Sequence, residues 1–212
     1  PGQTHKEDIT TGALAAANGG FTGVMTMPNT TPPIDNAGIV AENAMRSKGN
    51  IVDVYQSACA TAGRKGSKLA DLKSLVEAGV LAITDDGSPI ADDKIMKETL
   101  EVTAKLGVPV VQHCEIMSIT NGGIMNEGDL SRRLGVKGIS NASEYEIIAR
   151  DIELTRQTPG AHYHIQHIST KEAVELVRKA KAEGINVTAE ACPHHFILDD
   201  TAIEKYGTNA KM

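Results

Sequence analysis

The chain has 212 residues, of which 41% are hydrophobic and 23% are charged. This composition is that of a globular protein with one substantial core, and no apolar stretch approaches the roughly 18 residues of a transmembrane helix. The formal charge of -6, with its lysines and arginines scattered, argues against nucleic acid or a membrane as a partner and favours a small-molecule substrate. Three cysteines without zinc-finger spacing favour a reducing compartment, so we expect a cytoplasmic protein.

Six short apolar runs alternate with six helical patterns along the chain. The expected strands are residues 22–27, 51–55, 80–84, 108–112, 161–166 and 185–189. The expected helices are residues 7–18, 36–48, 69–78, 92–106, 141–157 and 170–182. This strict alternation predicts a parallel sheet, either doubly wound or closed into a (β/α) barrel. The one long connection, about 25 residues before Asn141, is of a length that is usually functional or mobile.

Chemically active residues follow three consecutive expected strands, as Asp85-Asp86-Gly87, His113-Cys114-Glu115 and His167 to Thr170. A barrel gathers its chemistry at the carboxyl ends of several strands, whereas an open sheet concentrates it at one switch point. The pattern therefore favours the barrel. The proline-rich segment after the first strand, Met27 to Pro33, lacks the glycines of a phosphate-binding loop and argues against a nucleotide site.

Two histidines and a carboxylate at neighbouring strand ends suit zinc, whose bound water has a pKa near ~7 and becomes a nucleophile. A single histidine is more often structural, but His113 and His167 close successive strands of the pattern. Strand alternation places His113 on the face of Val111 and His167 on the face of Ile165. The same alternation points His162 and His164 towards the helices.

The remaining candidates have competing interpretations. Asp85 and Asp86 cannot both face the barrel mouth from an extended strand; one should accept backbone hydrogen bonds in the turn at Gly87, unless both belong to a solvated turn. Cys114 is expected to be a small buried hydrophobe rather than a ligand. The cluster of Cys192, His194 and His195 is expected to be supporting or structural, because adjacent histidines do not easily bind one ion from a rigid strand end.

Six ordered motifs spread over nearly the whole chain carry a family resemblance. They are Met27 to Pro33, Ala82 to Gly87, Gln112 to Glu115, Asn126 to Ile139, His164 to Thr170 and Val187 to His195. Together they resemble class I, bacterial-type dihydroorotase of the amidohydrolase superfamily. The resemblance implies a (β/α)8 TIM-type barrel of the metal-dependent hydrolase kind. Residues 1–212 would form one partial barrel domain with the second to seventh βα units, truncated at both ends, with the first and eighth strands outside it.

The resemblance also implies an activity: the reversible interconversion of N-carbamoyl-L-aspartate and L-dihydroorotate in de novo pyrimidine biosynthesis, with one or two zinc ions. His113 and His167 would bind zinc, Asp86 would bridge to a second metal position, and a hydroxide would attack the ring amide. Asn29 would bind the substrate carboxylate, although it suits a β-turn equally well. The family's His-x-His and its general acid/base Asp would lie before Pro1 and beyond Met212. No catalytic residue is therefore assigned within the chain, and the chain alone is expected to be inactive.

Two alternatives stay open. The parent could be another cyclic amidohydrolase, allantoinase or dihydropyrimidinase-like, since these enzymes share the metal chemistry. It could also be a non-catalytic dihydroorotase-like partner of aspartate transcarbamoylase, but such relatives generally lose metal histidines, and His113 and His167 are retained. Partners beyond the small-molecule substrate would be a second copy of the chain or aspartate transcarbamoylase.

Overall fold

A computed structural model describes residues 3–211, so the Pro1–Gly2 opening and Met212 lie outside the described residues. Its main feature is a six-stranded sheet in which every pairing is parallel. The strands are β1 (Gly23–Thr26), β2 (Asp53–Ala58), β3 (Ala82–Ile83), β4 (Val110–Gln112), β7 (Tyr163–Ile165) and β8 (Val187–Ala189). All six expected strands are present, most of them shorter than the apolar runs that predict them.

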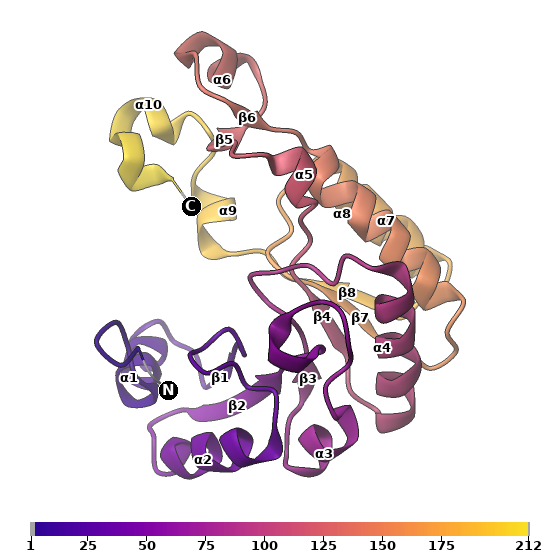
Figure 1. The fold of residues 1–212 in the computed structure, drawn as a ribbon. Coiled ribbons are helices and arrows are strands. Elements are labelled where there is room, and N and C mark those ends of the chain that lie inside the picture. Colours follow the sequence, from indigo (N-terminus) through magenta and orange to yellow (C-terminus); the bar gives the residue numbers. More distant parts are fainter. Residues whose placement is uncertain (1–2, 212) are drawn as a thin grey trace.

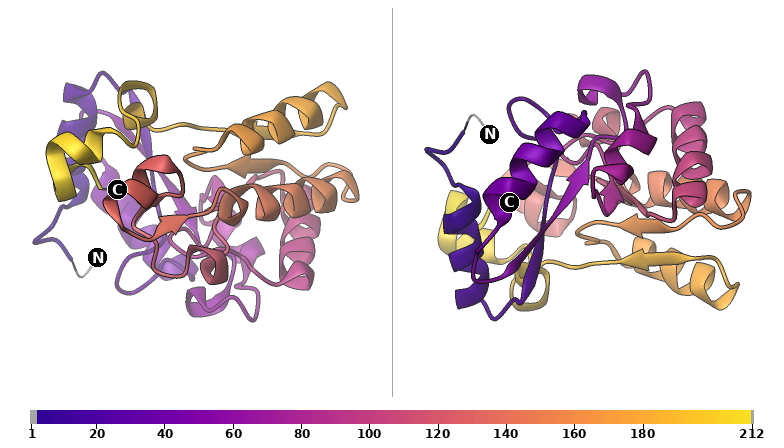
Figure 2. Two further views of the ribbon diagram at one scale, coloured as in Figure 1. Left: turned by 90° about the horizontal axis from the view of Figure 1, so that it is seen from above. Right: turned by 90° about the horizontal axis from the view of Figure 1, so that it is seen from below.

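The order of the strands in the sheet is β1-β2-β3-β4-β7-β8, the same as their order in the chain. A doubly wound sheet reverses direction at a switch point, and this sheet does not. Each βα unit instead adds its strand on the same side of the previous one, and the sheet curves as part of a barrel wall (Figures 1 and 2). The prediction of a partial barrel with six strands is confirmed.

The helices expected between the strands are also present, within a few residues of their predicted bounds. They are α1 (Ile9–Asn18), α2 (Ala37–Ser47), α3 (Leu72–Glu77), α4 (Asp93–Leu106), α7 (Ala142–Arg156) and α8 (Lys171–Ala182). Side chains that accept backbone N–H groups start five of them: Asp8, Asn36, Asp71, Asp92 and Thr170. Gly107 ends α4 in the left-handed conformation, with φ 72°.

The core lies between the outer face of the sheet and these helices. Val110, Tyr163 and Val187 are paired in register across three strands and all three are buried in this layer. The neighbouring row of Val111, His164 and Thr188 therefore faces the inside of the barrel. The expectation that His162 and His164 point towards the helices is wrong. Both imidazoles instead contact the Thr188 hydroxyl, at 2.8 and 2.7 Å.

The long connection after β4 contains structure of its own. It consists of α5 (Met117–Thr120), β5 (Met125–Asn126), α6 (Asp129–Leu134) and β6 (Gly138–Ile139), with β5 and β6 forming a small parallel sheet. The segment after β8 holds α9 (Pro193–Ile197), α10 (Ala202–Tyr206) and a 3-10 turn at Gly207–Ala210. Arg133 of α6 pairs with Glu204 of α10, so the two segments meet at one end of the molecule (Figure 1).

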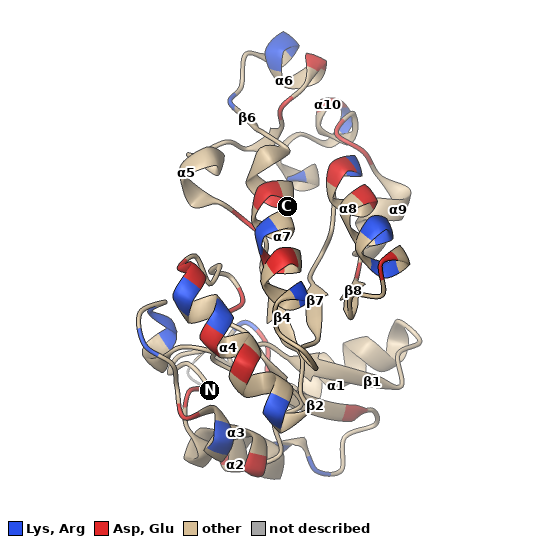
Figure 3. Cartoon of the chain, turned by 90° about the vertical axis from the view of Figure 1, so that its right-hand side faces the viewer, with Lys and Arg blue, Asp and Glu red and all other residues tan. Residues whose placement is uncertain are grey.

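Charged residues of both signs are interspersed along α4, α7 and α8 (Figure 3). Such mixed faces are typical of helices that turn one side to water and the other to a core. Within the part of the chain that the structure describes, none of the helices has the length and apolar character to cross a membrane.

Candidate metal centre

Asp86, His113 and His167 converge at the carboxyl ends of β3, β4 and β7. One ligand atom from each lies within 4.8 Å of the others. His113 Nδ1 is 3.0 Å from His167 Nε2 and 4.0 Å from Asp86 Oδ1. Two nitrogens on one tetrahedral zinc are separated by roughly 3.4 Å, given Zn–N bonds of about 2.0–2.1 Å. The donor set therefore fits such an ion with small side-chain movements.

The His113 ring is oriented by Glu115, two residues further on. Glu115 Oε2 lies 2.9 Å from His113 Nε2 and accepts its N–H, which leaves the Nδ1 lone pair directed at His167 and Asp86. A carboxylate behind a ligating imidazole is the usual arrangement that fixes the tautomer in metal sites. Burial opposes ionisation of Glu115, but hydrogen bonds with Thr120 and His113 bring the pKa of this carboxyl below its ordinary value.

His167 is placed by a turn rather than by strand alternation. Its φ of 35° lies in the left-handed region, so the face expected from Ile165 does not apply. The buried carboxylate of Glu144 on α7 holds the turn by four hydrogen bonds, from the backbone and hydroxyl groups of Ser169 and Thr170. Burial first, and then the neighbouring His113, lower the pKa of His167, which favours the neutral ring that a metal requires.

Asp86 is held by two residues from other loops. Asn29 Nδ2 donates to Asp86 Oδ2 at 2.8 Å, which leaves Oδ1 facing His113. The Arg64 guanidinium donates to the Asp86 backbone carbonyl. Asn29, the residue expected to bind substrate, thus lies beside the centre, on an exposed loop after β1.

Asp85 has a structural position that differs from both interpretations of the sequence. It is 1% exposed, so it does not belong to a solvated turn. Its carboxylate accepts the backbone N–H of Thr61, at 3.1 Å, and the Thr61 hydroxyl, rather than groups of the turn at Gly87. Burial outweighs these hydrogen bonds and raises the pKa of Asp85. The residue therefore ties the end of β3 to the loop after β2.

A model of the family described as dihydro-orotase-like matches residues 1–173. The chain belongs to this family. Dihydroorotases from Endomicrobium trichonymphae and Carboxydothermus hydrogenoformans are each 46% identical to the whole of it, and that of Anaplasma phagocytophilum is 45% identical. The chain spans about half the length of these relatives, 50%, 49% and 47% respectively. The family resemblance drawn from the six motifs is confirmed.

Solved structures show the same fold. The L-hydantoinase from Arthrobacter aurescens superposes with a TM-score of 0.76 at 19% identity, over 94% of this chain and 46% of that one. A dihydroorotase from Campylobacter jejuni gives a TM-score of 0.66 at 20% identity, over 94% of this chain and 53% of that one. Both cover nearly all of this dihydro-orotase-like chain, so its curved sheet is shared with enzymes of known structure.

Sequence reasoning missed the residues that support the centre. Glu115 could have been found from its spacing to His113, whereas Glu144 and Arg64 lie far away in the sequence and leave no local signal. The expectation that Cys114 is buried is confirmed, and its Sγ lies 3.2 Å from the Tyr163 hydroxyl. Burial raises the pKa of this thiol well above its usual range.

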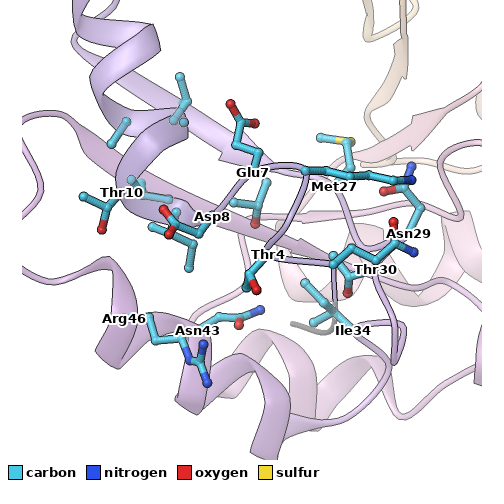
Figure 4. A pocket seen from close by; sticks show the side chains of 18 of the residues that line it. Thr4, Glu7, Asp8, Thr10, Met27, Asn29, Thr30, Ile34, Asn43 and Arg46 are labelled. Carbon is cyan, nitrogen blue, oxygen red and sulfur yellow. The ribbon is translucent and has the colours of Figure 1, made fainter.

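A hollow of about 730 Å³ lies beside β1 rather than over the centre. Figure 4 shows Met27 and Asn29 at one end of it and Asn43 and Arg46 of α2 at the other. Of the four residues expected to bind metal or substrate, only Asn29 lines it. Asp86, His113 and His167 are not among the residues that line this cavity, so the cavity is distinct from the metal centre.

Proposed function

We propose that this chain supplies the metal-binding part of a dihydroorotase, a hydrolase that interconverts N-carbamoyl-L-aspartate and L-dihydroorotate in de novo pyrimidine biosynthesis. The observation that carries the proposal is the convergence of Asp86, His113 and His167 in a chain whose curated relatives, 43–46% identical, are dihydroorotases. The substrate is then a small molecule, the compartment the cytoplasm, and the domain a single (β/α) barrel of which residues 1–212 form a part.

Zinc is the ion that this donor set suits, as one ion or as one of a pair. We propose that His113 Nδ1, His167 Nε2 and the Asp86 carboxylate hold it. When bound, zinc supplies an acidified water as nucleophile and polarises the amide carbonyl. Glu115 keeps the His113 ring in the tautomer that offers its Nδ1 lone pair. Glu144 keeps His167 in its left-handed turn through Ser169 and Thr170.

Asn29 is proposed to bind the substrate carboxylate. Its amide nitrogen carries two N–H groups, and one of them is used on Asp86 Oδ2. The second N–H is the group available to a substrate carboxylate. Asn29 would thus join substrate and metal-binding carboxylate through one amide, and this link would orient the substrate next to the centre.

The test is turnover by the full-length protein loaded with zinc, assayed on dihydroorotate, hydantoin and allantoin. We expect dihydroorotate to be the preferred substrate. Preference for hydantoin or allantoin would identify another cyclic amidohydrolase. No turnover together with a stable complex with aspartate transcarbamoylase would identify a non-catalytic partner. We propose separately that the full-length protein forms a homodimer or a complex with aspartate transcarbamoylase. Sedimentation of the same sample tests this.

The 212-residue chain by itself is expected to have no measurable activity, even with added zinc. It spans half the length of its relatives, and the loss of a proton-transfer group alone typically costs ~10²- to 10⁴-fold. Turnover of dihydroorotate that copurifies with the chain and disappears in His113→Ala would contradict this expectation.

A further inference from the structure

Cys192, His194 and His195 form a second cluster of metal-ligating side chains, outside the centre at Asp86. From the sequence these residues are expected to be supporting or structural, because adjacent histidines on a rigid strand end do not easily bind one ion. In the structure they do not project from a strand end. Cys192 caps α9, and the two histidines lie in its first turn. One ligand atom from each of the three residues lies within 4.8 Å of the others. All three are partly exposed, so an ion could reach them.

The chemistry of this set is specific. One thiolate and two imidazoles are donors that zinc-class cations prefer, whereas magnesium and calcium take oxygen ligands. Tetrahedral zinc with Zn–S of about 2.3 Å and Zn–N of about 2.0–2.1 Å separates its donor atoms by roughly 3.4–3.6 Å. The three ligand atoms, which lie up to 4.8 Å apart, must therefore come about 1 Å closer together. Rotation of these partly exposed side chains brings the ligand atoms together without movement of the sheet.

The contacts within this cluster indicate which lone pair is available. The Cys192 backbone N–H donates to His195 Nδ1 over 3.3 Å, a long hydrogen bond that turns this lone pair towards Cys192. The His194 ring lies edge-on to His195, with centroids 4.3 Å apart. An ion between Cys192 Sγ and His195 Nδ1 would replace the long hydrogen bond with a stronger interaction. His194 is then the third ligand within reach.

We propose that Cys192, His194 and His195 bind a zinc-class divalent cation through one thiolate and two imidazoles, with water completing the coordination. The Cys192 thiol releases its proton to solvent when the ion binds. Because α9 follows β8, this second site lies at the carboxyl end of the sheet, on the same side as the Asp86 centre. The inference goes beyond the proposed dihydroorotase activity and does not depend on it.

Cobalt(II) is the probe that tests the second site, because a thiolate ligand gives it a near-ultraviolet charge-transfer absorption that His and Asp ligands do not. Titration of the 212-residue chain with cobalt is expected to produce this absorption. Cys192→Ser should abolish it, and the double variant His113→Ala/His167→Ala should retain it. His194→Gln and His195→Gln should each weaken cobalt binding by about tenfold or more.

Cys114→Ala is the matched control, because Cys114 is a buried thiol directly after His113. It should retain the absorption. Absence of the absorption in the unmodified chain, or its survival in Cys192→Ser, would overturn the proposal. Loss of the absorption in Cys114→Ala would show that the thiolate ligand is Cys114, beside the Asp86 centre. That result would also overturn the proposal. If Cys192→Ser does not fold, alkylation of Cys192 in the unmodified chain decides: bound cobalt must slow the reaction, and an unchanged rate overturns the proposal.

Discussion

The residues that hold His113 and His167 differ, and this difference bears on how the centre tolerates substitution. His113 is oriented through its own ring by Glu115, whereas His167 is oriented through the backbone that Glu144 fixes. Asp86 is fixed by Asn29. We expect Asp86→Ala and His167→Ala each to lower the zinc affinity of the 212-residue chain by about tenfold or more, since each removes one of three donors. Calorimetric titration in a Cys192→Ser background measures the Asp86 centre alone.

His162→Ala is the matched control for these variants. His162, directly before β7, is also partly buried, but it contacts Thr188 and offers no donor to the centre. The zinc affinity of the His162→Ala variant should equal that of the parent chain. Unchanged zinc binding in both Asp86→Ala and His167→Ala would show that the ligand assignment is wrong, whatever the activity of the full-length protein.

At the scale of helices and strands, local patterns in the sequence predict most of the fold. Apolar runs alternate with segments of 3.6-residue periodicity, and glycines and capping residues lie between them. These patterns place every strand of the main sheet and the helices between the strands. The direction of His162 and His164 is not predictable in this way, because both faces of a barrel strand are covered and alternation does not say which face is inside. The turn at His167 and the four hydrogen bonds to Glu144 join distant segments, so only the folded chain reveals them.

One buried carboxylate links α7 to the sheet through hydrogen bonds. Asp151 pairs with Arg150 at 2.7 Å and accepts hydrogen bonds from Tyr163 of β7 and Gln112 of β4. Burial, opposed mainly by Arg150, raises its pKa from 3.8 to about 6. The folded state therefore holds the Asp151 proton more tightly than the unfolded state does. This contribution to stability is full below pH 3.8 and is lost as the pH rises through about 6.

Asp151→Asn tests this linkage, because asparagine keeps the shape of the side chain without a titratable group. Between pH 4 and pH 7 the free energy of unfolding of the parent should fall relative to that of the variant, by up to about 3 kcal/mol. Urea denaturation at four pH values across this range measures the difference. A difference that stays constant, or that moves in favour of the parent as the pH rises, would contradict the raised pKa.

At the scale of the whole molecule, the sheet formed by the described residues has one open edge at β1 and another at β8. Within residues 3–211, β1 pairs only with β2, and β8 only with β7. Neither strand contains Pro or Lys, the residues that usually prevent edge strands from pairing with other chains. Met25 in the middle of β1 is 37% exposed. We expect the 212-residue chain to self-associate through these edges, or to recruit a partner that covers them.

Met25→Lys places a charge on this edge and should lower the self-association constant by about tenfold, which corresponds to about 1.4 kcal/mol. Met45→Lys is the matched control, because Met45 is 71% exposed and lies on α2, outside both edge strands. Sedimentation velocity over a range of concentrations compares the two variants with the parent. An equal loss of association in both variants would mean that the added charge itself, and not its position on the β1 edge, causes the loss. A stable monomer whose β1 and β8 amides exchange slowly would show that the edges are already protected, because free edge groups exchange readily with water.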